Sequence, residues 1–156
     1  MAAITSPWGY KYINIFTIYI YIMEKILGSW KLVENLNFSE FLIYTQTPWY
    51  QRQIAEYSNI NIVLTKTGED MYNKSVDSVF YTQNEDIILD GTEREYAENI
   101  KKSYTFNDKS IDVNITGSIV NWTEQIKFIE PNLFVNYKWF INDKEFSASQ
   151  VFNRSK

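Results

Sequence analysis

After Ser58 the chain is a series of short apolar runs separated by polar turn segments, and no other feature limits the possible folds as strongly. Within one run, Ile111, Val113 and Ile115 alternate with polar residues, as Val135, Tyr137 and Trp139 do in another. This alternation is typical of strands that bury one face. The turn segments are Lys66–Glu69, Asn107–Lys109, Thr116–Ser118, Glu130–Asn132 and Asn142–Lys144. The spacing predicts about ten strands, the first from Leu27 to Leu36.

Residues 37 to about 57 interrupt this β pattern and favour two short helices. Asn37 and Glu40 have the spacing of a capping box at a helix start. Phe38, Phe41 and Leu42 then fall on one helical face. Pro48 ends the first helix and suits the first turn of a second, which continues to about Glu56.

An open sheet of this kind would leave unpaired backbone groups at its two edges. The simplest way to pair them is to curl the meander into a barrel. We therefore predict an all-β fold, a ten-stranded up-and-down antiparallel β-barrel (β-clam) with a helix-turn-helix lid between its first two strands. The 156-residue length fits one domain. The 12 Tyr and 10 Phe favour strands. A barrel slightly wider than eight strands can hold one small ligand.

The composition argues against several function classes. The chain has neither His nor Cys, so the commonest general base, the commonest metal ligand and every thiolate are missing. The net charge of −4 and the lack of a Lys/Arg cluster argue against nucleic acid. We therefore expect a monomeric binding protein with no metal and no cofactor, and not an enzyme.

Residues 1–23 differ from the remainder because Tyr12–Met23 consists almost wholly of Ile, Tyr and Phe. The run is too short for a membrane span of about 20 apolar residues. Three interpretations stay open: a misassigned start with Met23 as the true first residue, a signal-like segment, or a structured extension. We expect residues 24–156 to form the barrel domain.

Two segments resemble the N-terminal signature of the intracellular lipid-binding proteins, the family of the fatty-acid- and retinol-binding proteins in the calycin superfamily. These are Gly28–Val33 (GSWKLV) and Asn37–Leu42 (NFSEFL). The likeness continues in Arg52–Ala55, in the turn at Asn107–Asp108 and in Ser149–Phe152, and it covers about residues 24–156. It implies a ten-stranded barrel with a helical lid and one lipid in its cavity.

The resemblance also implies where a lipid head group lies. Many fatty-acid binders hold the carboxylate with an Arg late in the barrel and an Arg-x-Tyr pair on the last strand. Counted from the Asp108 turn, these positions fall on Lys127, Gln150 and Phe152, and Gln125 shares the face of Lys127. Lys127 favours an acidic head group, whereas Gln150 is similar to the retinol-binding branch. The alternative for Lys127 is an ordinary solvated lysine on the outside.

The ligand chain is expected to contact Phe38, Phe41, Val135, Tyr137 and Phe152, and the family likeness adds Leu42, Arg52 on the second lid helix and the turn near Phe80. The expected function is cytoplasmic transport or buffering of a long-chain fatty acid or similar hydrophobic ligand, with transient membrane contact through the lid. The alternatives are retinoid binding, a secreted lipocalin-like carrier, and a barrel enzyme such as a lipid isomerase.

Overall fold

The computed structural model describes the backbone of residues 7–57, 59–78 and 82–155, and the side chains of residues 17–56, 59–78 and 82–155. The three helices in these ranges are α1 (Pro7–Ile26), α2 (Phe38–Tyr44) and α3 (Trp49–Tyr57). The strands are β1 (Gly28–Leu36), β2 (Asn61–Gly68), β3 (Met71–Asp77), β4 (Thr82–Ile88), β5 (Arg94–Ala97), β6 (Ile100–Asn107), β7 (Ser110–Gly117), β8 (Asn121–Ile129), β9 (Asn132–Ile141) and β10 (Lys144–Arg154).

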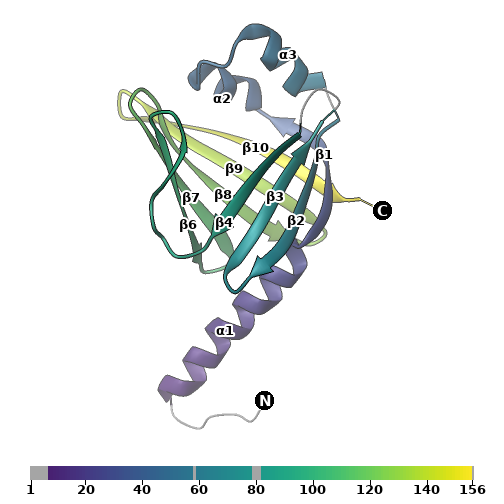
Figure 1. The fold of residues 1–156 in the computed structure, drawn as a ribbon, viewed down its shortest axis with the longest axis vertical. Helices are drawn as coiled ribbons and strands as arrows, with labels where there is room; N and C mark the ends of the chain where they lie inside the picture. The colour runs from purple at the N-terminus through teal and green to yellow at the C-terminus, as the bar shows by residue number, and fades with distance from the viewer. Residues whose placement is uncertain (1–6, 58, 79–81, 156) are drawn as a thin grey trace.

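The ten strands form one antiparallel sheet that curls into a barrel (Figure 1). Its order is β4-β3-β2-β1-β10-β9-β8-β7-β6-β5, so β1 pairs with the last strand as well as with β2. The order ends at β4 and β5, which are not hydrogen-bonded to each other. The predicted fold class is confirmed, with an interruption of the backbone ladder between β4 and β5.

Helices α2 and α3 lie between β1 and β2 in sequence and over one mouth of the barrel in space (Figure 1). The predicted helix pair is therefore confirmed, but the predicted capping box is wrong. Asn37 has a left-handed backbone with φ of 59° and makes no side-chain cap. Its amide instead donates a hydrogen bond of 2.9 Å to the carbonyl of Ser147 on β10, which ties the start of the lid to the barrel rim.

Helix α1 approaches the opposite end of the barrel from the lid, and its last turns lie against the strands (Figure 1). Ile22, Met23 and Ile26 are buried there, with Ile26 only 1% exposed. Tyr19 donates a hydrogen bond of 2.7 Å to Asp70 in the β2–β3 turn. Helix α1 runs through residue 23 without a break, while the domain boundary at this point stays a prediction.

The junction between α1 and β1 depends on a glycine and on two side chains that bond to the helix end. Gly28 has φ of +116°, a region that side-chain-bearing residues rarely adopt. Trp30 is fully buried, and its indole nitrogen donates a hydrogen bond of 2.8 Å to the carbonyl of Ile26. Arg154 on β10 donates to the carbonyls of Leu27 and Lys25. These bonds satisfy carbonyls that a helix end otherwise leaves open.

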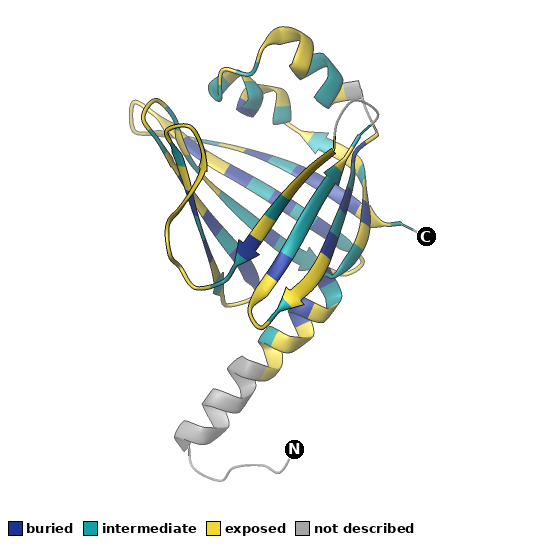
Figure 2. Ribbon diagram, in the orientation of Figure 1, coloured by how far each residue is buried: buried dark blue, intermediate teal, exposed yellow. Residues whose placement is uncertain are grey.

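The burial pattern follows the strand alternation. Many of the buried residues lie on β7 to β10 and on the last turns of α1, whereas the lid consists mostly of intermediate and exposed residues (Figure 2). On β9, Leu133, Val135 and Tyr137 are buried and the residues between them less so. In the described part of the chain, no helix is both long enough and apolar enough to cross a bilayer.

Candidate functional site

A cavity of about 190 Å³ lies inside the barrel beneath the lid. Most of its lining is apolar, and its polar lining residues are Lys74, Tyr137 and Gln150. The apolar lining comes from α2, α3, β2, β3, β8, β9, β10 and the α3–β2 loop: Phe38, Leu42, Ala55, Ile60, Ile62, Leu64, Val76, Ile126, Leu133, Val135 and Phe152. Such a lining suits a molecule with a long apolar part.

A second cavity of about 370 Å³ adjoins the first and shares Leu42, Lys74 and Val76 with it. Phe41 and Trp122 line it on the side of the lid and β8. Together the two spaces fall in the range of about 300–1,000 Å³ that is usual for small-molecule sites. The interior can therefore accommodate one ligand that extends from the apolar cavity into the second one.

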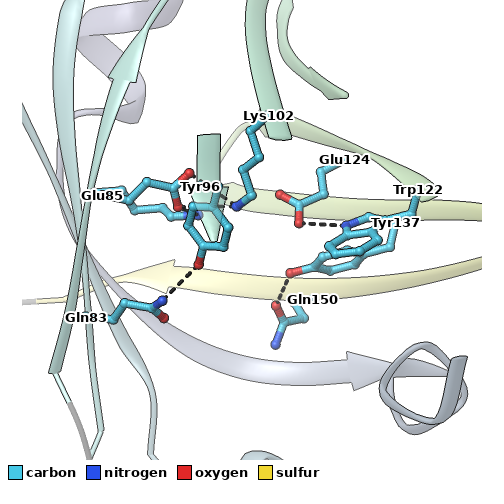
Figure 3. A network of polar contacts seen from close by, with 9 residues as sticks. Gln83, Glu85, Tyr96, Lys102, Trp122, Glu124, Tyr137 and Gln150 are labelled. Atoms are coloured by element: carbon cyan, nitrogen blue, oxygen red, sulfur yellow. Dashed lines mark hydrogen bonds and ion pairs between the residues drawn. The ribbon is translucent and has the colours of Figure 1, made fainter. Parts of the chain in front are cut away.

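A hydrogen-bonded chain of neutral side chains borders the first cavity. The hydroxyl of Tyr137 donates a bond of 2.7 Å to Oε1 of Gln150 (Figure 3). Nε2 of Gln150 in turn donates to Oδ1 of Asn35 on β1 at 3.2 Å. Gln150 is only 6% exposed, so these bonds offset the cost of burying its amide. The last strand therefore presents an uncharged polar group to the cavity.

Four charged side chains line the second cavity, and we call them the interior ion cluster: Lys74 on β3, Glu85 on β4, Lys102 on β6 and Glu124 on β8. Nζ of Lys102 lies 3.2 Å and Nζ of Lys74 lies 3.6 Å from the carboxylate of Glu85. Glu124 accepts a bond of 3.1 Å from the indole nitrogen of Trp122 (Figure 3). Two cations thus converge on one carboxylate, with a second carboxylate on the facing strand.

Burial and charge act in opposite directions on Lys74. Burial lowers the pKa of its ammonium, but the attraction of Glu124 and Glu85 outweighs burial and leaves the pKa above its usual value. The folded protein therefore keeps Lys74 charged. Both carboxylates therefore stabilise the charged form of this buried lysine.

Tyr96 on β5 belongs to the same region. Its hydroxyl accepts a hydrogen bond of 2.8 Å from Gln83 on β4, and Nζ of Lys102 lies 3.8 Å from its ring centroid (Figure 3). Burial and then the charge of Glu85 raise the pKa of the Tyr96 hydroxyl. The Gln83–Tyr96 bond and the Lys102–Glu85 pair span the interval where β4 and β5 lack backbone bonds, so side chains close the barrel there.

The lid is held by aromatic contacts rather than by hydrogen bonds alone. The ring centroids of Phe41 and Tyr137 are 4.5 Å apart, and Phe41 also lies 5.4 Å from Trp122 and 5.5 Å from Trp139. Phe38 lies 5.3 Å from Tyr137. Pairs at such distances contribute about 0.5–1.5 kcal/mol each beyond their burial. The same face of α2 therefore lines the cavity and packs the lid against the barrel.

The structure brings most of the predicted site residues together. The predicted residues around the first cavity are Phe38, Leu42, Val135, Tyr137, Gln150 and Phe152, and Phe41 lines the second. They come from α2, which packs on β10, and from the paired strands β9 and β10. Their role in ligand binding stays a prediction.

The expectation that Lys127 and Gln125 face the cavity is wrong. In the β8–β9 register Lys127 pairs with Phe134 and Gln125 with Asn136, whereas Ile126 pairs with the cavity residue Val135. Paired residues point to the same side of a sheet, so both side chains lie on the outer face. Gln125 there donates a bond of 3.2 Å to the hydroxyl of Ser110.

One further predicted residue, Arg52, is outside the lining of both cavities. Arg52 on α3 donates a hydrogen bond of 2.8 Å to the carbonyl of Thr47, so its guanidinium braces the loop between the lid helices. Phe80 lies outside the described residues.

The interior ion cluster was missed by the sequence interpretation. Its members come from four strands and are at least eleven positions apart along the chain, as Lys74 and Glu85 show. A usable signal existed in β8, where Trp122, Glu124 and Ile126 alternate with polar residues. An acidic residue between two apolar residues of the same face indicates a buried charge, and a buried charge requires a partner.

No protein-family model matches the sequence, and no curated protein matches it either. Among solved structures, fatty-acid-binding protein 1 of Echinococcus granulosus matches with a TM-score of 0.75 and 16% identity over 86% of this chain and 100% of that one. The Schistosoma mansoni fatty-acid-binding protein in complex with arachidonic acid gives 0.75 and 19% over 86% and 98%. Lipid binding protein 8 of Caenorhabditis elegans gives 0.75 and 16% over 85% and 97%. The likeness extends over nearly all of each of these proteins, and the chain therefore has the fold of the fatty-acid- and lipid-binding proteins.

Proposed function

We propose that the protein binds a long-chain fatty acid or similar hydrophobic ligand inside the barrel and buffers or transports it without changing any covalent bond. The observation that carries this proposal is the apolar cavity beneath a helical lid. Each methylene that leaves water contributes about 0.8 kcal/mol, so a long acyl chain offsets the cost of ordering ligand and lid. The structural neighbours support the proposal, since their names describe binding of fatty acids or lipids.

The proposal is tested by filling the cavity. Val135→Trp adds an indole to the lining, whereas Phe134→Trp places the same side chain on the outer face of the same strand. We expect the first variant to bind the neutral dye Nile red at least about tenfold more weakly and the second to bind it as the native protein does. Circular dichroism verifies that both variants fold.

Equal dye binding by both variants would contradict a ligand site at this cavity. Native mass spectrometry of the purified full-length protein then identifies any lipid carried through purification. A protein that carries no lipid and binds no dye would refute the proposed function as a whole.

Exchange of ligand with a membrane through the lid is part of the proposal. The lid presents Ile43, Trp49 and Tyr50 to solvent, with exposed fractions of 52%, 66% and 59%. Aromatic side chains of this kind favour the interface of a bilayer. We also propose a monomer in the cytoplasm, as the family resemblance implies. An N-terminal sequence of the native protein that lacks the first residues through signal cleavage would support a secreted carrier instead.

A further inference from the structure

The charges that line the two cavities cancel. Among the residues that the structure describes, the charged side chains in these linings are the members of the interior ion cluster, two lysines and two glutamates. Three of these side chains are well shielded, with exposed fractions of 17% for Lys74, 10% for Glu85 and 8% for Lys102. The interior therefore offers a ligand no excess of positive charge.

A carboxylate head group would enter this interior at a cost. Its removal from water is strongly unfavourable unless a cation with free hydrogen-bonding capacity compensates the charge. Both lysines already face Glu85, at 3.2 and 3.6 Å, and Glu124 adds a second negative charge near Lys74. An incoming anion would compete with these carboxylates and be repelled by them. A neutral head group needs only hydrogen-bond partners and meets no such opposition.

We propose that Glu85 and Glu124 select against anionic lipids, so that the ligand is a long-chain molecule with an uncharged polar end, such as an alcohol, an ester or an amide. This inference rests on the proposed function and names the ligand class of the same cavity. The two carboxylates act by neutralising the positive charge of the lysines before a ligand binds.

Glu85 has a structural role that Glu124 lacks, although the charges of both stabilise the buried ammonium of Lys74. Glu85 on β4 pairs with Lys102 on β6 and so helps to close the barrel between β4 and β5. Glu124 lies on β8, within the continuous part of the sheet, where β7 and β9 both pair with it through backbone bonds. Its carboxylate accepts from Trp122, which a glutamine oxygen can do as well. Glu124→Gln therefore removes the charge while keeping this hydrogen bond.

The test measures displacement of Nile red from the full chain by dodecanoic acid and by 1-dodecanol at a pH where the acid is ionised. We expect the native protein to bind the alcohol at least about tenfold more tightly than the acid. Glu124→Gln is expected to raise the affinity for the acid by about tenfold and to change that for the alcohol by less than about twofold. Glu69→Gln, in the exposed β2–β3 turn, changes the total charge equally and serves as control. Glu85→Gln is the second variant if Glu124→Gln does not fold.

The outcomes separate the two proposals. Native protein that binds the acid as tightly as the alcohol would overturn the inference and leave the proposed function intact. Equal gains in acid affinity for Glu124→Gln and Glu69→Gln would also overturn it, because the effect would then be one of total charge. Failure of both ligands and of the dye to bind would overturn the proposed function and the inference with it.

Discussion

Phe41 on the first lid helix lies with its ring centroid 4.5 Å from that of Tyr137 on β9. Because Phe41 is also buried against Trp122 and Trp139, its truncation removes the main anchor of the lid. We expect Phe41→Ala to lower the free energy of unfolding by about 3–5 kcal/mol in urea titrations. Ile43→Ala, at a residue of the same helix that is 52% exposed, is expected to change it by less than about 0.5 kcal/mol. Similar losses in both variants would contradict the anchoring role.

The Tyr137–Gln150 bond gives a second prediction. Tyr137→Phe keeps the ring but leaves Oε1 of Gln150 buried without its 2.7 Å donor. We expect a loss of about 1–3 kcal/mol in unfolding free energy. Tyr50→Phe on the exposed side of the lid is the matched control and is expected to be neutral. An unchanged stability of Tyr137→Phe would mean that the amide finds another donor.

Helix α1 is predicted to be an integral part of the folded unit. Ile26 is 1% exposed and Ile20 on the same helix is 40% exposed. We expect Ile26→Ala to cost about 2–5 kcal/mol in thermal or urea unfolding, and Ile20→Ala to cost far less. Equal, small effects at both positions would show that α1 does not pack on the barrel.

Stability is expected to fall at alkaline pH through Tyr19. Burial raises the pKa of its hydroxyl, and the hydrogen bonds with Tyr72 and Asp70 raise it further. The unfolded chain releases this proton near pH 10.0, the ordinary value, whereas the folded protein retains it. The contribution of the Tyr19 hydroxyl to the free energy of unfolding is therefore fully present below pH 10.0. It is lost as the pH rises above that value.

Urea titrations between about pH 8 and about pH 11 measure this dependence. Tyr19→Phe is expected to flatten the alkaline decline, and Tyr21→Phe, whose residue is 49% exposed on the same helix, is expected to keep it. A decline of the same steepness in Tyr19→Phe would assign it to other groups.

The fold was predictable because the strand alternation, the turn residues and the proline between the lid helices all indicate the same architecture. Alternation in Ile111, Val113 and Ile115 marks a half-buried strand, and the turn at Asn107–Lys109 marks its start. Pro48 separates two helices where the structure has them. The failed cap at Asn37 has a local cause, since its side chain bonds to Ser147 and its backbone turns the chain from β1 into α2.

The site was harder to predict because a shift of one residue reverses the face of a strand. Counting from a distant turn placed Lys127 inward, but the register with β9 places Ile126 there. The alternation of Trp122 and Ile126 with the polar residues of β8 indicates the correct face, but the single Glu124 among the apolar residues obscures it. The interior ion cluster was not predicted as a whole for another reason. Lys74 and Glu85 are register partners on the adjacent strands β3 and β4, but only the folded barrel brings Lys102 of β6 to them.

The buried end of α1 limits the depth of the cavity inside the barrel. Ile22, Met23 and Ile26 belong to the buried core, and α1 meets the barrel on the side opposite the lid (Figure 1), so we expect this end to be closed to an acyl chain. Methylenes beyond that depth remain in water and gain none of the roughly 0.8 kcal/mol that burial provides. Affinity in a homologous series of ligands should therefore climb with chain length to a plateau, and the plateau would gauge the depth directly.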